Sequence, residues 1–288
     1  MSASGRLPKL GVSLGNLHPR VWPELVDAAE ALGFESVWIP EHLVLPMSMA
    51  GSPRPGETHP PVPPTIPVFD PWAYLAYVAG RTERLRLGTF VYNLGLRHPF
   101  ASARAIQTVD VVSGGRVEIG VGAGWLRAEW EAVGLEFATR GARLDEALDI
   151  CRRLWSEPVV EHHGRFYDFG PVAFEPKPVQ QPHPPIHVGG VSEAALRRAV
   201  AVGDGWIGML STPEEVAGYA ARLEKLADGM GRSAPVEVTA GGSASSVADL
   251  ERWADAGLDR LLLADLGSSS GALATLEQRA AQLAEALP

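Results

Sequence analysis

The sequence predicts a (β/α)8 barrel, an α/β fold formed by a single domain over residues 1–288. Short apolar runs of strand period alternate with helical segments along the chain. Strict alternation of this kind implies parallel strands with right-handed crossovers. Eight strands can be counted, the number that closes a barrel. An open doubly wound sheet is the alternative, and the length alone would also suit two small domains.

The first half of the chain provides four of the expected strands, at residues 9–14, 36–39, 85–92 and 116–121. Helices are expected at 21–32, 70–82 and 99–112, and a further helix at 143–155. Asp70 is a suitable N-cap because Pro71 follows it at the first helical position. Residues 126–142 are polar and interrupted by glycine, which suggests a connection.

The second half starts with a small hairpin at residues 161–167, an insertion between strands four and five, and a proline-rich connection over 171–185. The remaining strands are expected at 185–188, 205–209, 236–240 and 260–264. Helices are expected at 192–202, 212–230, 247–256 and 271–287.

Composition excludes several classes of function. The formal charge of −9 and the pI of about 5.4 argue against nucleic acid as a partner. The amino-terminal residues lack a secretory signal, and no apolar run reaches the length of a membrane span, so a cytoplasmic location is expected. Cys151 falls on the apolar face of a helix, which suggests a buried, inert thiol. The histidine and cysteine spacing does not fit a zinc site.

The active site of a barrel lies at the carboxyl ends of its strands, so these ends give the candidate residues. Strand two ends in Glu41-His42, where an imidazole can exchange protons near neutral pH. Strand four ends in Gly122-Ala123-Gly124, and strand five ends in Gly189-Gly190 before a helix capped by Ser192. Glycine turns at such places approach anionic, phosphorylated ligands closely, although they also serve as plain tight turns.

Two further features have mainly structural interpretations. Glu118 has the parity of an inward-facing residue, and Arg86 on the next strand is its expected partner. Residues 46–69 are rich in proline and follow strand two as a long insertion. This segment is expected to form the substrate-side wall of the pocket, with a surface loop on the rim as the alternative.

Taken together, four stretches resemble the bacterial luciferase-like oxidoreductases. They are Ser36-Val37-Trp38-Ile39-Pro40-Glu41-His42, Leu85-Arg86-Leu87-Gly88-Thr89, Gly115 to Trp125, and Pro184-Pro185-Ile186-His187-Val188-Gly189-Gly190. The likeness covers roughly residues 10–210 in the right order. The acidic residue followed by histidine after strand two looks most like the branch that uses the deazaflavin coenzyme F420.

The resemblance implies a flat isoalloxazine-type ring over the strand ends. It implies a non-proline cis peptide bond at Phe90–Val91, behind the ring, with Ala123 also beside the coenzyme. The resemblance also implies that Gly124, Gly189 and Gly190 contact the phosphate groups of the coenzyme, and that His42 lies beside its ring. Sugar-phosphate dehydrogenases of this branch have a glutamate after the strand-four glycines. Here Trp125 holds that place, so a sugar phosphate substrate is in doubt and the proton donor is left open.

The sequence therefore predicts an oxidoreductase that transfers hydride between F420 and a small organic substrate. His42 is expected to handle the proton, with Glu41 orienting it or contacting the coenzyme. The first alternative is an FMN-dependent monooxygenase on the same fold. Others are a barrel glycosidase using Glu41 and Asp265, and a coenzyme carrier without turnover. The resemblance also makes a homodimer possible.

Overall fold

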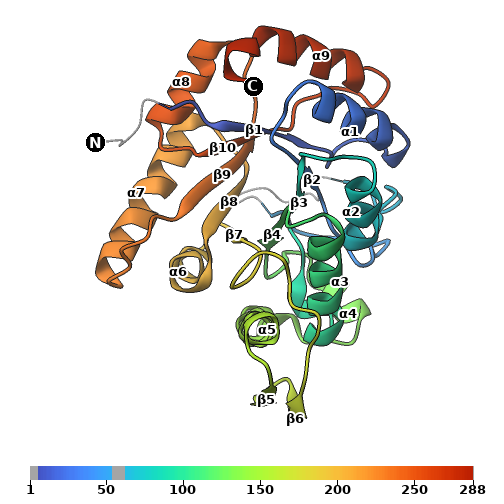
Figure 1. The fold of residues 1–288 in the computed structure, drawn as a ribbon, viewed down its shortest axis with the longest axis vertical. Coiled ribbons are helices and arrows are strands. Elements are labelled where there is room, and N and C mark those ends of the chain that lie inside the picture. The colour runs from blue at the N-terminus through green and yellow to red at the C-terminus, as the bar shows by residue number, and fades with distance from the viewer. Residues whose placement is uncertain (1–5, 54–61, 288) are drawn as a thin grey trace.

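The computed structural model describes residues 6–53 and 62–287, and its centre is a closed barrel of eight parallel strands (Figure 1). The barrel strands are β1 (Lys9–Ser13), β2 (Ser36–Ile39), β3 (Arg86–Thr89), β4 (Val117–Val121), β7 (Ile186–Gly189), β8 (Gly205–Leu210), β9 (Glu237–Gly242) and β10 (Arg260–Leu263). Val12 of β1 pairs with both Leu263 of β10 and Val37 of β2, which closes the ring. The predicted eight-stranded barrel is confirmed, and the open sheet is excluded.

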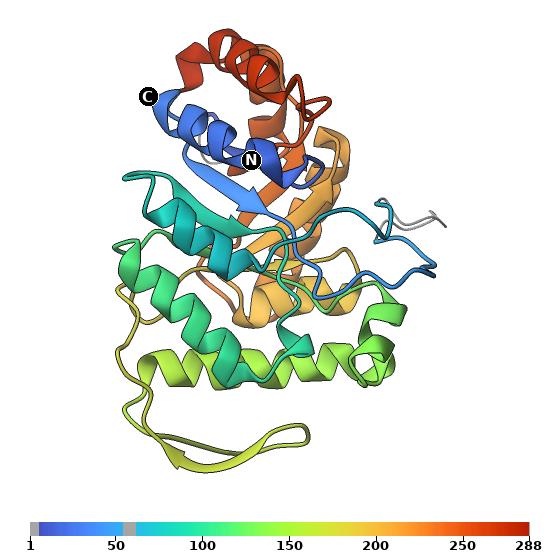
Figure 2. The same cartoon turned by 90° about the vertical axis from the view of Figure 1, so that its right-hand side faces the viewer.

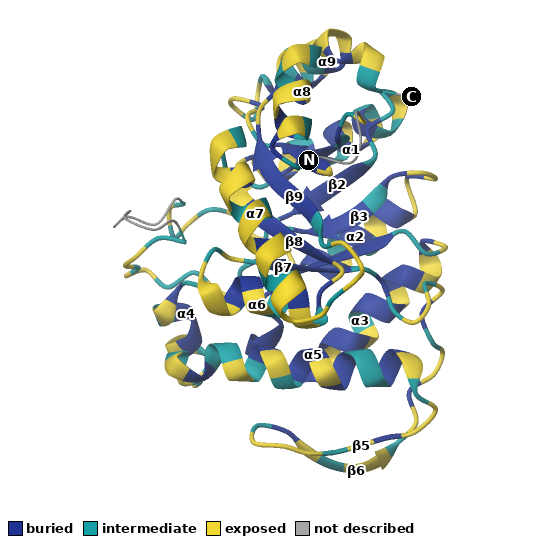
Figure 3. Ribbon diagram, turned by 90° about the vertical axis from the view of Figure 1, so that its left-hand side faces the viewer, coloured by how far each residue is buried: buried dark blue, intermediate teal, exposed yellow. Residues whose placement is uncertain are grey.

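Helices surround the barrel and bury their apolar stripes against it (Figures 2 and 3). They are α1 (Trp22–Ala31), α2 (Pro71–Ala79), α3 (Pro99–Val112), α4 (Arg127–Ala132), α5 (Arg140–Ser156), α6 (Glu193–Val202), α7 (Pro213–Gly229), α8 (Val247–Asp255) and α9 (Ala272–Gln282). Short 3₁₀ turns are η1 (Pro19–Val21), η2 (Leu94–Leu96), η3 (Phe137–Thr139) and η4 (Ala284–Ala286). As expected, the Asp70 carboxylate accepts the Ala73 N–H and caps α2.

One helix was not predicted. The stretch at 126–142, interpreted from its polarity as a connection, contains α4 and η3, and α5 begins at Arg140 instead of residue 143. The reason is local: Leu126 and Trp130 lie four residues apart and are both fully buried, so one helical turn packs inward despite its polar neighbours.

Two strands lie outside the barrel. β5 (Val160–His163) and β6 (Asp168–Val172) pair antiparallel below α5 and away from the barrel (Figure 2). The Glu146 carboxylate of α5 accepts the backbone N–H groups of Phe166 and Tyr167 at 3.0 and 2.9 Å. The same carboxylate lies 3.2 Å from Nε2 of His162. These contacts attach the hairpin to α5.

The barrel interior is divided into an apolar layer and a charged layer. Trp38, Ile207 and Leu262 form the apolar layer, against which Phe90 and Val91 pack. The Trp38 ring packs directly on Gly88, and only glycine fits at position 88, because a Cβ there would be 2.2 Å from the ring. The layer therefore separates the amino-terminal end of the barrel from the strand ends.

The charged layer lies at the amino-terminal end, where β3 and β10 begin with Arg86 and Arg260. Glu118 is in contact with both arginines and with Nε2 of His187, which lies 2.5 Å away. Burial by itself would raise the pKa of Glu118, but the His187 hydrogen bond and the positive charges of His187, Arg260 and Arg86 outweigh it and lower the pKa. The predicted structural pairing of Glu118 with Arg86 is confirmed.

Cys151 is fully buried on α5, as predicted. Its thiol lies 3.7 Å from the Pro99 carbonyl oxygen, and burial raises its pKa, so the reactive thiolate is disfavoured.

Candidate active site

The strand ends meet around a bulge that follows β3. The Phe90–Val91 peptide bond is cis, as the family resemblance implied. On one side, the Phe90 N–H donates to the Ile39 carbonyl oxygen of β2 at 2.7 Å. On the other, the Tyr92 N–H donates to the Gly120 carbonyl oxygen of β4 at 2.7 Å. The bulge is thereby held between β2 and β4, and its two side chains remain partly exposed at the mouth of the barrel.

The glycines at the ends of β4 and β7 make room for this bulge. A Cβ on Gly122 would lie 2.7 Å from Val91 Cγ2, and one on Gly189 would lie 3.0 Å from Val91 Cγ1. Val91 therefore occupies the space that side chains on these two strands would need. The result is a partly exposed apolar floor across β3, β4 and β7.

Two further glycines are required by backbone conformation. Gly124 has a φ of 77° and Gly190 has a φ of 112°. A Cβ on Gly124 would also lie 2.7 Å from Trp130 Nε1, and one on Gly190 would lie 3.1 Å from the Ala195 Cβ. Ser192 caps α6 as expected, since its hydroxyl accepts the Ala195 N–H at 3.2 Å.

His42 forms its ion pair with a residue that the sequence analysis did not single out. Its Nδ1 lies 3.0 Å from Oε2 of Glu129, which is on α4. The other carboxylate oxygen, Oε1, accepts the backbone N–H groups of Leu43 at 2.6 Å and Val44 at 3.3 Å. The Glu129 side chain is fully buried, whereas the His42 side chain is 15% exposed. The imidazole is thus the member of the ion pair that is accessible to solvent.

The prediction that Glu41 orients His42 is wrong. The Glu41 carboxylate turns away to accept the Asn93 N–H at 2.9 Å and the Arg97 guanidinium at 2.7 Å. Burial raises the pKa of Glu41, and the Arg97 charge acts in the opposite direction. Successive side chains of an extended segment point to opposite sides, which is why neighbours in sequence have different partners here. Glu41 ties the end of β2 to the loop after β3.

Trp125, in the place where related dehydrogenases were expected to have a glutamate, packs against His42. The two ring centroids are 5.9 Å apart and the planes are nearly perpendicular, at 87°. The strand-four end therefore presents an aromatic wall to the imidazole, and the carboxylate arrives four residues later, from Glu129.

The arrangement does not suit a two-carboxylate hydrolase. Glu41 is buried and engaged by Arg97, while Asp265 is exposed at the end of β10. Strand β1 lies between β2 and β10 in the barrel. The two acids that the glycosidase alternative requires are therefore not a matched pair across one site.

Two features are absent from the described part of the chain: a metal-binding cluster and a membrane-spanning helix. In residues 6–53 and 62–287, no three His, Cys, Asp or Glu side chains are grouped to hold a metal ion. None of the helices in the described part of the chain is long and apolar enough to cross a membrane.

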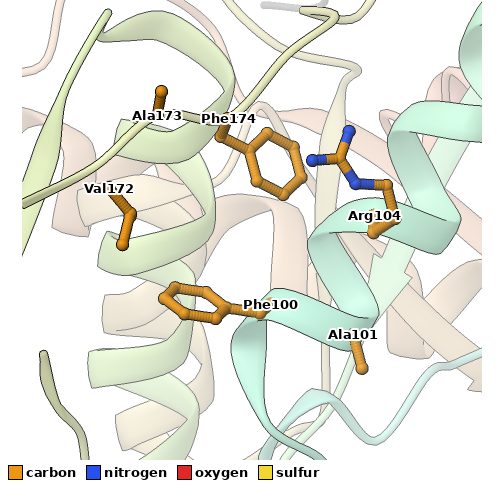
Figure 4. A pocket seen from close by; sticks show the side chains of 6 residues that line it. All are labelled: Phe100, Ala101, Arg104, Val172, Ala173 and Phe174. Atoms are coloured by element: carbon orange, nitrogen blue, oxygen red, sulfur yellow. The ribbon is translucent and has the colours of Figure 1, made fainter.

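A separate surface cavity of about 480 Å³ lies outside the barrel, between α3 and the segment after β6 (Figure 4). Phe100 and Phe174 form its sides, and the Arg104 guanidinium lies 3.8 Å from the centre of the Phe174 ring. Arg104 also donates to the Glu175 carbonyl oxygen at 2.6 Å. No barrel strand end contributes to the lining of this cavity, so it is distinct from the candidate active site.

The closed barrel, the cis bulge after β3 and the histidine at the end of β2 define an oxidoreductase of the luciferase-like superfamily. The chain belongs to the luciferase-like monooxygenase family, whose model matches residues 9–286. An uncharacterised protein of Mycobacterium tuberculosis (strain ATCC 25618 / H37Rv) is 34% identical over 262 residues, which is 89% of this chain and 91% of that protein.

Relatives in the superfamily differ in coenzyme. The FMNH(2)-dependent dimethylsulfone monooxygenase of Pseudomonas putida is 35% identical over 126 residues, 43% of this chain and 34% of that protein. Among solved structures, the coenzyme F420-dependent tetrahydromethanopterin reductase of Methanopyrus kandleri superposes with a TM-score of 0.78. That match has 17% identity and covers 99% of this chain and all of that one, so it shows a shared fold.

Proposed function

We propose that this protein is an F420-dependent oxidoreductase that transfers hydride between the coenzyme and a small organic substrate. The observation that carries the proposal is the position of His42. The imidazole is the partly exposed member of a buried ion pair and follows β2, the barrel neighbour of β3, whose bulge carries Val91.

The residues at the strand ends fit a flat ring with an anionic tail. Phe90 and Val91 offer apolar surface to one face of such a ring, and we expect Ala123, in the loop after β4, to contact the coenzyme as well. The glycines Gly124, Gly189 and Gly190 present backbone N–H groups without side chains, where phosphate oxygens are accommodated. Gly189 and Gly190 also precede the Ser192-capped start of α6, which favours negative charge.

The bound coenzyme supplies the hydride chemistry, and the protein supplies binding, orientation and proton handling. In this assignment the bulge fixes the plane of the ring, and the Trp125 wall helps to exclude water from the imidazole. His42 accepts or donates the proton that accompanies hydride transfer. Glu41, held by Arg97 and the Asn93 N–H, contributes by fixing the strand ends.

The coenzyme could be FMN, and the partial match to an FMNH(2)-dependent monooxygenase supports that second candidate. We favour F420 because the acidic residue followed by histidine after β2 resembles the F420 branch. The full-length superposition on an F420-dependent reductase is compatible with this assignment.

A binding titration of the purified protein with each coenzyme tests the proposal. We expect F420 to bind with a Kd in the micromolar range or tighter, and FMN more weakly. Fluorescence or absorbance changes of the coenzymes provide the measurement. Tighter binding of FMN, together with oxygen consumption in the presence of a flavin reductase, would reverse the assignment in favour of the monooxygenase.

We propose further that the protein is a single domain, is located in the cytoplasm and assembles as a homodimer. We also propose that residues 46–69 form the substrate-side wall of the pocket; residues 54–61 of this segment lie outside the described part of the chain.

A further inference from the structure

The carboxylate of Glu129 has a hydrogen-bond arrangement that determines what the His42 ring can do. It is fully buried, and its Oε1 accepts the N–H groups of Leu43 and Val44. A buried carboxylate that accepts two backbone N–H groups is stabilised as the anion. An ionised carboxylate has no proton to donate, so Nδ1 of His42, 3.0 Å from Oε2, must provide the hydrogen of that contact.

We propose that Glu129 is the positioning residue of His42, which locks the neutral imidazole in the Nδ1–H tautomer and leaves Nε2 as the proton-exchanging atom. The inference rests on the proposed function for its catalytic meaning, but the tautomer is a property of the protein alone. Glu129 thus brings a carboxylate to His42 from α4, whereas the end of β4 presents Trp125 to the ring.

The geometry supports this assignment from three sides. Glu129 is part of α4, so its position is fixed by that helix. One of its carboxylate oxygens contacts Nδ1 of His42, and the other accepts the backbone N–H groups of Leu43 and Val44. In residues 6–53 and 62–287, Nδ1 is the ring nitrogen of His42 with a hydrogen-bond partner. The perpendicular Trp125 ring limits rotation of the imidazole. Within these described residues, Nε2 is therefore the ring nitrogen open to a ligand.

The proton balance is simple. In substrate oxidation, a bound oxidised coenzyme would accept the hydride, and Nε2 of His42 would accept the proton. The ring then carries a proton on both nitrogens, and the Glu129 carboxylate stabilises the resulting imidazolium without taking a proton itself. In the reductive direction, Nε2 returns the proton to the substrate.

The chain contains a matched control for this arrangement. On the hairpin, Glu146 accepts two consecutive backbone N–H groups, of Phe166 and Tyr167, and lies 3.2 Å from a ring nitrogen of His162. The His162 side chain is 13% exposed, close to the 15% of His42. Glu146→Gln therefore makes the same chemical change to the same kind of clamp, on an element below α5 and away from the strand ends (Figure 2).

The decisive measurement is the ¹⁵N spectrum of the imidazole rings in protein labelled on histidine, with the His42 signals assigned from their loss in His42→Gln. In the wild type we expect the Nδ1–H tautomer at a pH where the ring is neutral. In Glu129→Gln, the amide can donate to Nδ1 while its oxygen still accepts the two backbone N–H groups, so the ring should switch to the Nε2–H tautomer. Glu129→Asp keeps an acceptor-only group and should retain the Nδ1–H form. Glu146→Gln should leave the His42 signals unchanged.

Kinetics with a proven substrate provide the second readout. Glu129→Gln should lower kcat by at least about tenfold and at most about 10⁴-fold, the loss that a wrong tautomer causes in a catalytic triad. Coenzyme Kd should change less than about threefold, and Glu129→Asp should recover part of the lost kcat. Glu146→Gln should keep wild-type kcat.

Each outcome decides a separate question. An Nε2–H tautomer in the wild type overturns the inference even if every variant fails to fold. Wild-type kcat in a Glu129→Gln variant with the switched tautomer would also overturn it. If F420 does not bind but the wild-type ring has the expected tautomer and Glu129→Gln switches it, then the proposed function fails and the positioning role of Glu129 stands.

Discussion

At the scale of single residues, His42 and Glu129 divide the properties of an acid–base site between them. The imidazole has 15% of its surface exposed and the carboxylate has none. Burial removes Glu129 from direct contact with a substrate, so its influence on a reaction must pass through His42. The partly exposed ring, in contrast, can contact a substrate directly, which suits proton exchange.

Replacement of His42 tests its role directly. His42→Ala should lower kcat by about 10²–10⁴-fold, the usual contribution of a general acid–base group, because it removes the imidazole proposed to exchange the proton. Coenzyme affinity should change much less. Steady-state kinetics and a coenzyme titration separate the two effects.

His162→Ala is the matched control, since it removes a similarly exposed histidine from a Glu146 clamp on the hairpin. It should retain wild-type turnover. Unchanged kcat in His42→Ala would instead make His42 a packing residue.

At the scale of elements, the site depends on how β3, β4 and β7 share space around Val91. Gly122 and Gly189 are close to Val91 on two different strands, so the three strand ends behave as one packed unit. The cis bulge presents Val91 to both neighbours. A substitution that adds a side chain at the end of one of these strands should therefore displace Val91 and alter the floor of the site.

Gly122→Ala should disturb this unit, because the new methyl group would lie 2.7 Å from Val91 Cγ2. Overpacking of this kind destabilises by about 1–3 kcal/mol, and displacement of Val91 should also weaken coenzyme binding. Chemical denaturation and the coenzyme titration measure the two effects.

The double variant Val91→Ala/Gly122→Ala removes the clash and serves as the control. It should recover most of the lost stability, giving a coupling free energy of about 1 kcal/mol or more between the two positions. Additive effects of the two substitutions would show that Val91 does not occupy the space above Gly122.

The elements of the site differ in how well they could be predicted from the sequence. The strand ends were predictable because hydrophobic periodicity and glycine turns are local signals, and a barrel brings all such ends to one face. The Glu41 and Glu129 partners were not predictable, because each depends on a side chain from another element. The available signal for α4 was the spacing of Leu126 and Trp130, which polar neighbours concealed. Arg97 similarly follows a strand end without any local pattern that would connect it to Glu41.

At the scale of the whole molecule, the barrel separates two groups of ionisable residues. Trp38, Ile207 and Leu262 lie between the candidate active site and the charged layer around Glu118. Arg260, the more buried of the two arginines in that layer, is 1% exposed and is also paired with Glu35 and Glu237. The charged layer thus contributes to stability at one end of the barrel, and the proposed acid–base groups lie at the other.

Glu118→Gln should therefore reduce stability without removing the site. Breaking a buried ion pair costs about 3–5 kcal/mol, and we expect the lower end because Arg260 retains two other acidic partners. The sign of the pH dependence follows from the lowered pKa of Glu118. In the wild type, the contribution of this carboxylate is fully present above its ordinary value of 4.5 and is lost as the pH falls below it. Denaturation at pH 7 and pH 3.5 measures both effects.

The difference in unfolding free energy between wild type and variant should thus shrink by about 1.4 kcal/mol for each pH unit below that value, as linkage requires for one proton. Groups that titrate in both proteins contribute equally to the two unfolding free energies, so their contributions cancel in this difference. Glu161→Gln, on the exposed hairpin, is the control for loss of one negative charge and should stay within about 0.5 kcal/mol of the wild type at pH 7. A difference that stays constant down to pH 3.5 would mean that Glu118 already carries a proton in the folded barrel, and that His187 and the two arginines do not hold it as a carboxylate.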